Sequence, residues 1–289
     1  MAKKRSANTH LSNLKRWGIV GAWLAVVVTL VLIVALGIMR DNDNPDTLAT
    51  GIAAGAQTQQ DGDALQRVKL PSGASNTTVT YPGFTVHFNP EYHIPNCVVY
   101  ELTREESYGK RDRQGNFTND TDVKGCANPW DYTSSGYDRG HMAPAGDMKW
   151  SADAMNASFM MTNVCPQRKS LNSGAWNDLE IKVREWARRY GAVVVATGPV
   201  LSRDMATIGK SRVAVPRHFF KVLLAERHGK RIALAFIYPN KPCNEPMSAY
   251  VVSVDEVERR TGIDFFAALP DDEENTIEAR SNINQWNHR

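Results

Sequence analysis

Apolar and polar positions divide the chain into an uncharged apolar run, a polar stretch and a long region of mixed patterning. The apolar run covers residues 17–39, and its length matches that of a helix that spans a bilayer. Residues 40–77 are rich in Asn, Asp, Gly, Ala and Thr without apolar periodicity, which predicts a flexible linker. We therefore expect a transmembrane helix, a linker, one folded domain over 78–270 and a polar tail over 271–289.

The folded domain carries several strand patterns and two helical ones. Strand candidates are a pair that flanks the turn at 81–83 and the runs 96–103, 192–197, 217–225 and 232–238. Apolar residues at steps of three and four from Trp176 to Tyr190 predict an amphipathic helix that ends at Gly191. A capping box at Ser253 predicts a second, short helix that ends at Gly262.

Basic residues lie on the N-terminal side of the apolar run. Five basic side chains fall within residues 1–16, and no acidic residue precedes Asp41. The positive-inside rule then predicts a cytoplasmic N-terminus, attachment to the membrane through residues 17–39 and an extracytoplasmic domain. A cleaved signal peptide has a shorter apolar region, so an uncleaved anchor is favoured. A basic, acid-free N-terminus is also compatible with organelle import, which makes the mitochondrial inner membrane the alternative location.

Composition is that of an ordinary globular protein, with 42% hydrophobic and 22% charged residues. Residues 1–42 hold six of the 34 basic and one of the 31 acidic residues, which leaves 28 basic and 30 acidic residues elsewhere. Residues 137–221 nevertheless hold 13 basic against 7 acidic side chains. A local basic excess of this kind favours binding to a phosphate backbone, and a mixed solvated surface is the alternative interpretation.

The run Asp138-Arg139-Gly140-His141 places an acid, a guanidinium group and an imidazole within four residues. An imidazole that titrates near neutral pH can take a proton from water. A neighbouring arginine can neutralise an anionic oxygen with a planar fork of donors. Hydrolysis of a phosphate diester would need both groups, although the run alone is also compatible with a structural turn.

A second group of polar residues follows in the order Asn163, Asn172, Glu180 and Arg184. Together with the Asp-Arg-Gly-His run, it resembles the DNA/RNA non-specific endonuclease family with the ββα-metal site, the endonuclease G-like nucleases. The resemblance covers roughly residues 80–268. It implies an α+β fold with a central, mainly antiparallel sheet flanked by helices, preceded in this chain by the predicted transmembrane helix.

The resemblance also implies roles for individual residues. His141 would be the general base that deprotonates water, and Asn172 the single direct protein ligand of a hydrated Mg²⁺, for which Mn²⁺ could substitute. Magnesium prefers oxygen donors and keeps several waters, which suits one amide ligand. Glu180 would hold a water bound to the metal or orient Arg184, and Asn163 would orient His141 or contact the phosphate.

Arginines supply the implied phosphate contacts. Arg139 and Arg184 are the candidate clamps at the reacting phosphate, and Asp138 is expected to organise the loop. The family has a further arginine upstream of its Asp-Arg-Gly-His run, for which Arg111 and Arg113 are both candidates. The full set of substrate-binding candidates is Arg111, Arg113, Arg139, Arg168 and Arg184.

Helical spacing connects four of these positions. Asn172, Trp176, Glu180 and Arg184 recur at intervals of four, so we expect them to stack along one side of the predicted helix as a wall of the active site. A surface ion pair of little energetic value between Glu180 and Arg184 is the alternative. His218 lies among core-forming aromatic residues and is expected to be structural.

The four cysteines, Cys97, Cys126, Cys165 and Cys243, include no C-x-x-C pair, which disfavours a structural zinc site. In an extracytoplasmic domain one or two disulfides are allowed, whereas Cys165 could instead be a buried thiol. A cysteine hydrolase that uses Cys165 is a further alternative, although the family pattern does not need a thiol there.

The sequence thus predicts a membrane-anchored, Mg²⁺-dependent endonuclease that hydrolyses DNA and RNA without sequence preference. No base-reading motif is present in the sequence, so contacts to phosphate and sugar are expected. The alternatives are a membrane-tethered nucleic-acid-binding protein without catalysis and a hydrolase of another phosphodiester or ester. A homodimer is compatible with the sequence.

Overall fold

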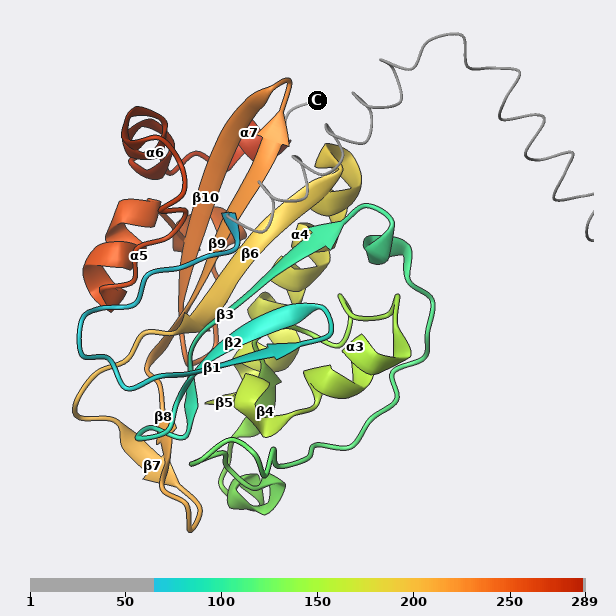
Figure 1. Cartoon of the computed structure of the whole chain (residues 1–289), viewed down its shortest axis with the longest axis vertical. Helices are drawn as coiled ribbons and strands as arrows, with labels where there is room; N and C mark the ends of the chain where they lie inside the picture. The colour runs from blue at the N-terminus through green and yellow to red at the C-terminus, as the bar shows by residue number, and fades with distance from the viewer. Residues whose placement is uncertain (1–64, 288–289) are drawn as a thin grey trace, which may run out of the picture. The chain divides into compact units, whose positions relative to one another are not determined.

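The computed structural model describes residues 65–287 (Figure 1). The predicted basic tail (1–16) and the predicted transmembrane helix (17–39) lie outside the described residues, as does the predicted linker up to residue 64. Within residues 65–287, no helix is long and apolar enough to cross a membrane. The domain boundaries proposed from the sequence stay a prediction.

The described chain folds into strands, helices and short helical turns. The strands are β1 (Thr77–Tyr81), β2 (Phe84–Asn89), β3 (Ile94–Thr103), β4 (Asp138–His141), β5 (Val164–Gln167), β6 (Ala192–Pro199), β7 (Ala206–Ile208), β8 (Val213–Val215), β9 (His218–Arg227), β10 (Lys230–Pro239) and β11 (Val251–Val252). The helices are α3 (Ala152–Ser158), α4 (Trp176–Tyr190), α5 (Val254–Thr261), α6 (Asp271–Glu278) and α7 (Asn284–Asn287). Short helical turns are η1 (Glu106–Tyr108), η2 (Pro129–Tyr132), η3 (Met161–Asn163), η4 (Leu171–Ala175) and η5 (Met247–Tyr250).

An antiparallel sheet organises the described part of the chain. Its strand order is β1-β2-β3-β6-β9-β10-β11, and every neighbouring pair is antiparallel. β1 and β2 join through Pro82 and Gly83, where Gly83 adopts a φ of +89° that suits glycine in a tight turn. The predicted α+β class with a mainly antiparallel sheet is confirmed, and each predicted strand overlaps an observed one.

Both faces of the sheet are covered, and side chains of one strand alternate between two cores. On β9, Phe219 and Leu223 belong to the core on the α4 side, whereas Phe220 and Leu224 belong to the core beneath α5 and α6 (Figure 1). This alternation follows from the period of two in a strand, and burial on both faces explains why β9 reads as a nearly continuous apolar run. Lys221 shares the α4 side with Phe219 and is fully buried.

Helix α4 forms as its periodicity predicts. Trp176, Leu179, Val183 and Trp186 are buried on the side that faces the sheet. Gly191 follows with a φ of +97°, a conformation that glycine adopts at helix ends without a Cβ penalty. Helix α5 also matches its prediction, because the Ser253 hydroxyl accepts the Glu256 N–H at 3.1 Å.

The C-terminal residues differ from the predicted polar tail. They form α6 and α7, and the Trp286 side chain is fully buried. Its ring lies 5.1 Å from that of Trp186 and 5.5 Å from that of Tyr190, with both pairs edge to face. A single aromatic residue in a polar stretch produces no periodic pattern, so the sequence did not reveal this contact with α4.

We expect Trp286→Ala to lower the free energy of unfolding by about 3–5 kcal/mol, because it removes a fully buried indole and leaves a cavity. Urea denaturation of the full chain measures this loss. Trp130→Ala is the matched control, since Trp130 is 67% exposed and should change stability little. A loss below about 1 kcal/mol for Trp286→Ala would mean that the C-terminal residues contribute little to the fold.

Candidate active site

Strands β4 and β5 hold the Asp-Arg-Gly-His run in a small sheet of its own. Asp138 pairs with Gln167 at one end, and His141 pairs with Val164 at the other. Between them, a Cβ on Gly140 would lie 2.1 Å from the side-chain oxygen of Gln167, so only glycine fits without a shift of that side chain. The buried Gln167 side chain thus occupies the space that a Cβ at position 140 would need, which explains the glycine in the run.

Asn163 fixes the backbone that follows His141. Its side-chain oxygen accepts the Ala143 N–H at 2.9 Å, and its amide nitrogen donates to the carbonyl oxygens of Ala143 and Ser158 at 2.8 and 2.9 Å. The Asn163 side chain is fully buried and does not line the cavity described next. Its contacts therefore suit the positioning of His141 rather than a contact with phosphate.

Most of the predicted site residues meet in one cavity of about 470 Å³. Its lining consists of Arg113, Arg139, His141, Pro144, Ala145, Gly146, Lys149, Asn172, Ser173, Asn177, Glu180 and Arg184. Four cationic side chains and one carboxylate face this space, so the lining is strongly basic. Such a lining suits an anionic ligand.

His141 lies at the inner end of this cavity and is 8% exposed. Its ring packs 5.1 Å from the rings of both Phe117 and Phe159. Burial, with a smaller contribution from the charge of Arg113, lowers the pKa of His141 to about 3. The imidazole is therefore neutral at physiological pH and able to accept a proton.

The two imidazole nitrogens differ in access. Nε2 is closed off from solvent and has no hydrogen-bond partner among the described residues. Nδ1 is not among the closed-off atoms, so it is the nitrogen with access to the cavity.

Asp138 orients Asn172. The Asn172 amide nitrogen donates to Oδ2 of Asp138 at 3.0 Å. Because a carboxylate only accepts hydrogen bonds, this contact turns the NH₂ group toward Asp138 and leaves the amide oxygen available. Asn172 lies in the turn η4, directly before α4, and lines the cavity.

A network of buried charges includes Glu180 and Arg184 of the cavity lining. Nη1 of Arg184 lies 2.6 Å from Oδ1 of Asp147. The Asp147 side chain is fully buried, and its Oδ2 accepts a further hydrogen bond from the Tyr100 hydroxyl at 2.8 Å. Burial raises the pKa of Glu180 to about 7, and the positive charge of Lys221 opposes this shift. Burial lowers the pKa of Lys221, and the negative charges of Glu180 and Asp147 oppose this shift. Opposite charges thus offset part of the desolvation cost in this network.

Arg139 is anchored on the opposite side of the cavity. Its guanidinium group donates twice to the carbonyl oxygen of Pro129 and lies 5.4 Å from the centre of the Phe117 ring. Both contacts restrict the side chain, so a ligand would meet a prepositioned cation. Arg113 lies 5.5 Å from the centre of the Phe159 ring, and it rather than Arg111 lines the cavity.

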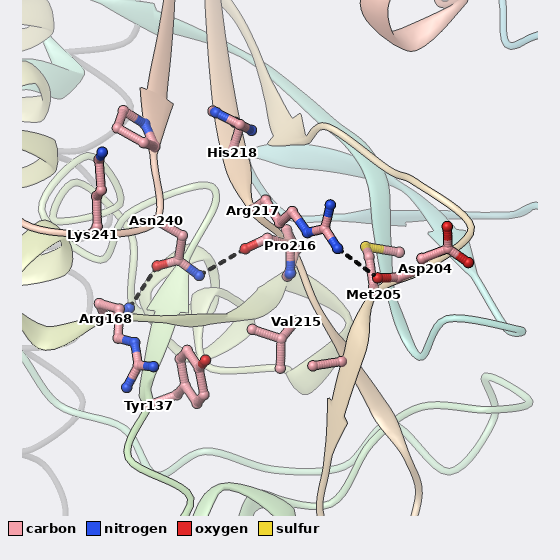
Figure 2. Close-up of a pocket in the computed structure, with 12 residues that line it drawn as sticks. Tyr137, Arg168, Asp204, Met205, Val215, Pro216, Arg217, His218, Asn240 and Lys241 are labelled. Atoms are coloured by element: carbon pink, nitrogen blue, oxygen red, sulfur yellow. Dashed lines mark hydrogen bonds between the residues drawn. The ribbon is translucent and has the colours of Figure 1, made fainter.

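Two predicted residues lie apart from this cavity. Arg111 is exposed, and its backbone N–H donates to the Lys149 carbonyl at 3.3 Å. Arg168 lines a second cavity of about 780 Å³, where its guanidinium group lies 4.2 Å from the centre of the Tyr137 ring (Figure 2). Its backbone N–H also donates to Oδ1 of Asn240 at 2.7 Å (Figure 2).

Three members of the predicted row, Asn172, Glu180 and Arg184, line the cavity, and the prediction is wrong for Trp176. Trp176 is fully buried against Phe219 and Tyr238, at the start of α4 and directly after η4. The cavity side of α4 instead carries Asn177, Glu180 and Arg184, at steps of three and four. A step of three residues back from Glu180, instead of four, would have found Asn177.

Lys149, Asp147 and Lys221 were also missed from the sequence. Lys149 and Asp147 follow the Asp-Arg-Gly-His run within ten residues, but they share no helical or strand period with it. Lys221 lies on a strand distant in sequence, and an internal lysine in an apolar run is the only local signal of a buried charge.

All four cysteines lie in the described part of the chain, and none is in a disulfide. Cys165 is buried on β5, and burial raises its pKa well above the usual range of a thiol. A protonated thiol is a weak nucleophile, and Cys165 does not line the basic cavity. These facts argue against the cysteine-hydrolase alternative.

Comparisons with known proteins agree with this geometry. A family model described as DNA/RNA non-specific endonuclease matches residues 61–272. The mitochondrial endonuclease G of Homo sapiens is 41% identical over 198 residues, which cover 63% of this chain and 67% of that protein. The mitochondrial nuclease EXOG of Danio rerio is 34% identical over 223 residues, which cover 71% of this chain and 65% of that protein. The chain therefore spans about two thirds of the length of these curated relatives.

A solved structure is similar as well. A chain from the crystal structure of the EndoG/EndoGI complex matches with a TM-score of 0.65 and 30% sequence identity. The match covers 68% of this chain and 89% of that chain. An antiparallel sheet with helices on it is thus a fold that this chain shares with a relative of known structure.

The predicted localisation is wrong. The relatives carry the names of mitochondrial nucleases, which contradicts the predicted extracytoplasmic location of the domain. The prediction relied on the hydropathy and flanking charge of residues 17–39, which lie outside the described residues. Flanking basic residues do not distinguish membrane orientation from organelle import.

The buried neutral imidazole predicts a pH-dependent stability. The unfolded chain takes up a proton on His141 near a pKa of about 6.5, whereas the folded pKa is about 3. The unfolded state therefore binds more protons below pH 6.5, and the free energy of unfolding falls as the pH falls toward 3. Between pH 7 and pH 5, we expect wild type to lose about 2 kcal/mol more than His141→Asn.

Urea denaturation in EDTA at pH 7 and pH 5 measures this difference. His228→Asn is the matched control, because it makes the same substitution at an exposed turn. Equal losses for wild type and His141→Asn would show that His141 is protonated alike in the folded and unfolded states.

Proposed function

The chain belongs to the DNA/RNA non-specific endonuclease family, and on that premise we propose that it is a metal-dependent endonuclease that hydrolyses phosphodiester bonds of DNA and RNA without sequence preference. One observation carries the proposal. A neutral, desolvated imidazole of His141 faces the same basic cavity as the free amide oxygen of Asn172. A binding protein would need neither a proton acceptor nor an oriented metal ligand.

The donors at this cavity fit a hydrated divalent cation. The family is a divalent-metal-dependent one, and we propose Mg²⁺ as the ion, with Mn²⁺ as its substitute. Asn172 would bind it directly through its amide oxygen, because Asp138 holds the NH₂ group. Glu180 would hold it through a bridging water, which matches the habit of Mg²⁺ to keep several waters. When bound, the ion would stabilise the negative charge that develops on the phosphoryl group and the leaving 3′ oxygen.

His141 would act as the general base. Its Nδ1 would take a proton from the water that attacks the scissile phosphorus, because the ring is unprotonated at neutral pH and the negative charge of a bound phosphate would raise its pKa toward the range of an effective base. The Phe117 and Phe159 rings limit rotation of the imidazole and exclude water from its far side. Asn163 would position the ring through the backbone at Ala143.

Four cations would hold the phosphate backbone. Arg139 and Arg184 are restrained by Pro129 and Asp147, so they would lie ready for the reacting phosphate. Arg113 and Lys149 line the same cavity and would contact the reacting or a neighbouring phosphate. Contacts to phosphate carry no sequence information, which supports a broad specificity.

The direct test is digestion of supercoiled plasmid and of RNA by the full chain with Mg²⁺, with Mn²⁺ and with EDTA. We expect cleavage of both polymers only with a divalent ion. Asn172→Ala should lower metal-dependent cleavage by about 100-fold or more, because it removes the direct ligand. Arg111→Ala is the matched control, since Arg111 lies outside the cavity and should retain most of the activity.

Two results would contradict the proposal. Binding of DNA that weakens with salt, without cleavage under any metal condition, would favour a nucleic-acid-binding protein. Cleavage of small diesters without cleavage of polynucleotides would favour a hydrolase of another phosphodiester.

A further inference from the structure

A second cluster of ionisable side chains lies on the other face of the sheet, away from the basic cavity. Helices α5 and α6 pack there against β10 (Figure 1). Asp255 and Glu258 lie one turn apart on α5, and Glu278 is the last residue of α6. One carboxylate oxygen from each of the three lies within 4.8 Å of the others.

Glu278 is the unusual member of this cluster. The residue is only 3% exposed, and its Oε1 has no hydrogen-bond partner among the described residues. A buried carboxylate without a partner is costly, so native proteins pair such groups or use them to coordinate metal ions. Within residues 65–287, no lysine or arginine forms an ion pair with Asp255, Glu258 or Glu278.

Asp255 and Glu258 complete a site that is partly open to solvent. Oε1 of Glu258 accepts the Phe265 N–H at 2.8 Å, which fixes the carboxylate and leaves its second oxygen for a ligand. Asp255 is exposed and lies at the mouth of the cluster. Burial, with a smaller contribution from the charge of Glu258, raises the pKa of Glu278 to about 9. The cluster thus combines a buried carboxyl group, an exposed one and three oxygen donors at close range.

We propose that Asp255, Glu258 and Glu278 form a divalent-cation site of the calcium class that ties α6 to α5. Two oxygens on opposite sides of Ca²⁺ are about 4.6–5.2 Å apart at ordinary bond lengths, whereas two on opposite sides of Mg²⁺ are about 4.0–4.2 Å apart. The three carboxylate oxygens lie within 4.8 Å of one another, which fits either ion, so the choice of Ca²⁺ rests on the number of carboxylates. Three carboxylates exceed the one or two that Mg²⁺ commonly takes from a protein.

The site would stabilise the C-terminal residues. Helix α6 leads to α7, whose Trp286 packs on Trp186 of α4. A cation that holds Glu278 to α5 would therefore strengthen the attachment of the segment that covers α4. This role is separate from the hydrolysis proposed above and does not depend on it.

The test uses the full chain with Asn172→Ala in every sample, so that the active-site metal does not contribute. After removal of metal with EDTA and dialysis, Ca²⁺ is titrated calorimetrically. Thermal unfolding is then measured with Ca²⁺, with Mg²⁺ and without metal. We expect one bound Ca²⁺ per chain and an unfolding midpoint about 5 °C higher at a hundredfold excess over Kd, with a smaller shift for Mg²⁺.

Variants of the cluster identify the site. Glu278→Gln should abolish Ca²⁺ binding and the midpoint shift, and without metal it should be about as stable as its parent because glutamine replaces a buried, unpartnered carboxyl group at nearly the same volume. Asp255→Asn, at an exposed position that cannot disturb the core, should weaken Ca²⁺ binding about tenfold or more. Asp272→Asn, at an exposed position of α6 outside the cluster, is the matched control and should bind Ca²⁺ as its parent does.

Two outcomes would overturn the proposal. Absence of Ca²⁺ binding in the parent would mean that the three carboxyl groups share protons instead of a cation. Binding that survives unchanged in both Glu278→Gln and Asp255→Asn would place the ion elsewhere on the chain.

Discussion

The ion pair between Arg184 and Asp147 lies where the charged cavity meets the apolar core, and the site depends on it. Asp147 is fully buried and also accepts the Tyr100 hydroxyl, so one carboxylate joins α4, β3 and the loop after β4. Removal of either partner would leave a buried charge uncompensated, which typically costs 3–5 kcal/mol. This contact holds α4 at the cavity, and with it Asn177 and Glu180 on the same side of the helix.

Burial also determines the protonation state of His141. His141 is desolvated between two phenylalanine rings, and the same burial that excludes water keeps its imidazole neutral. The Gln167 side chain of β5 fills the space in which a Cβ of Gly140 would lie. Asp138 lies at the other end of β4 from His141 and orients Asn172. One four-residue strand therefore supplies a proton acceptor and fixes the candidate metal ligand.

Periodicity predicted the elements well, but it could not predict contacts between them. The three-and-four pattern of α4 and the apolar runs of β6, β9 and β10 depend on local burial, which a sequence records directly. The row failed at Trp176 because four residues of a helix turn by about 40° more than one full circle, and this drift places Trp176 on the side of α4 that faces the sheet. Lys221 comes near the site, and Trp286 packs on α4, only because the tertiary fold brings distant parts of the sequence together. No local sequence pattern therefore indicates the role of either residue.

The central claim is that His141 accepts the proton in a metal-dependent hydrolysis of polynucleotides, and rescue of His141→Gly by imidazole tests it most directly. The account predicts that the variant cuts plasmid at least about 100-fold more slowly than wild type with Mg²⁺. Added imidazole, which can enter the space left beside Phe117 and Phe159, should restore part of the rate in proportion to its concentration. Cleavage at the wild-type rate by folded His141→Gly without imidazole would contradict the account.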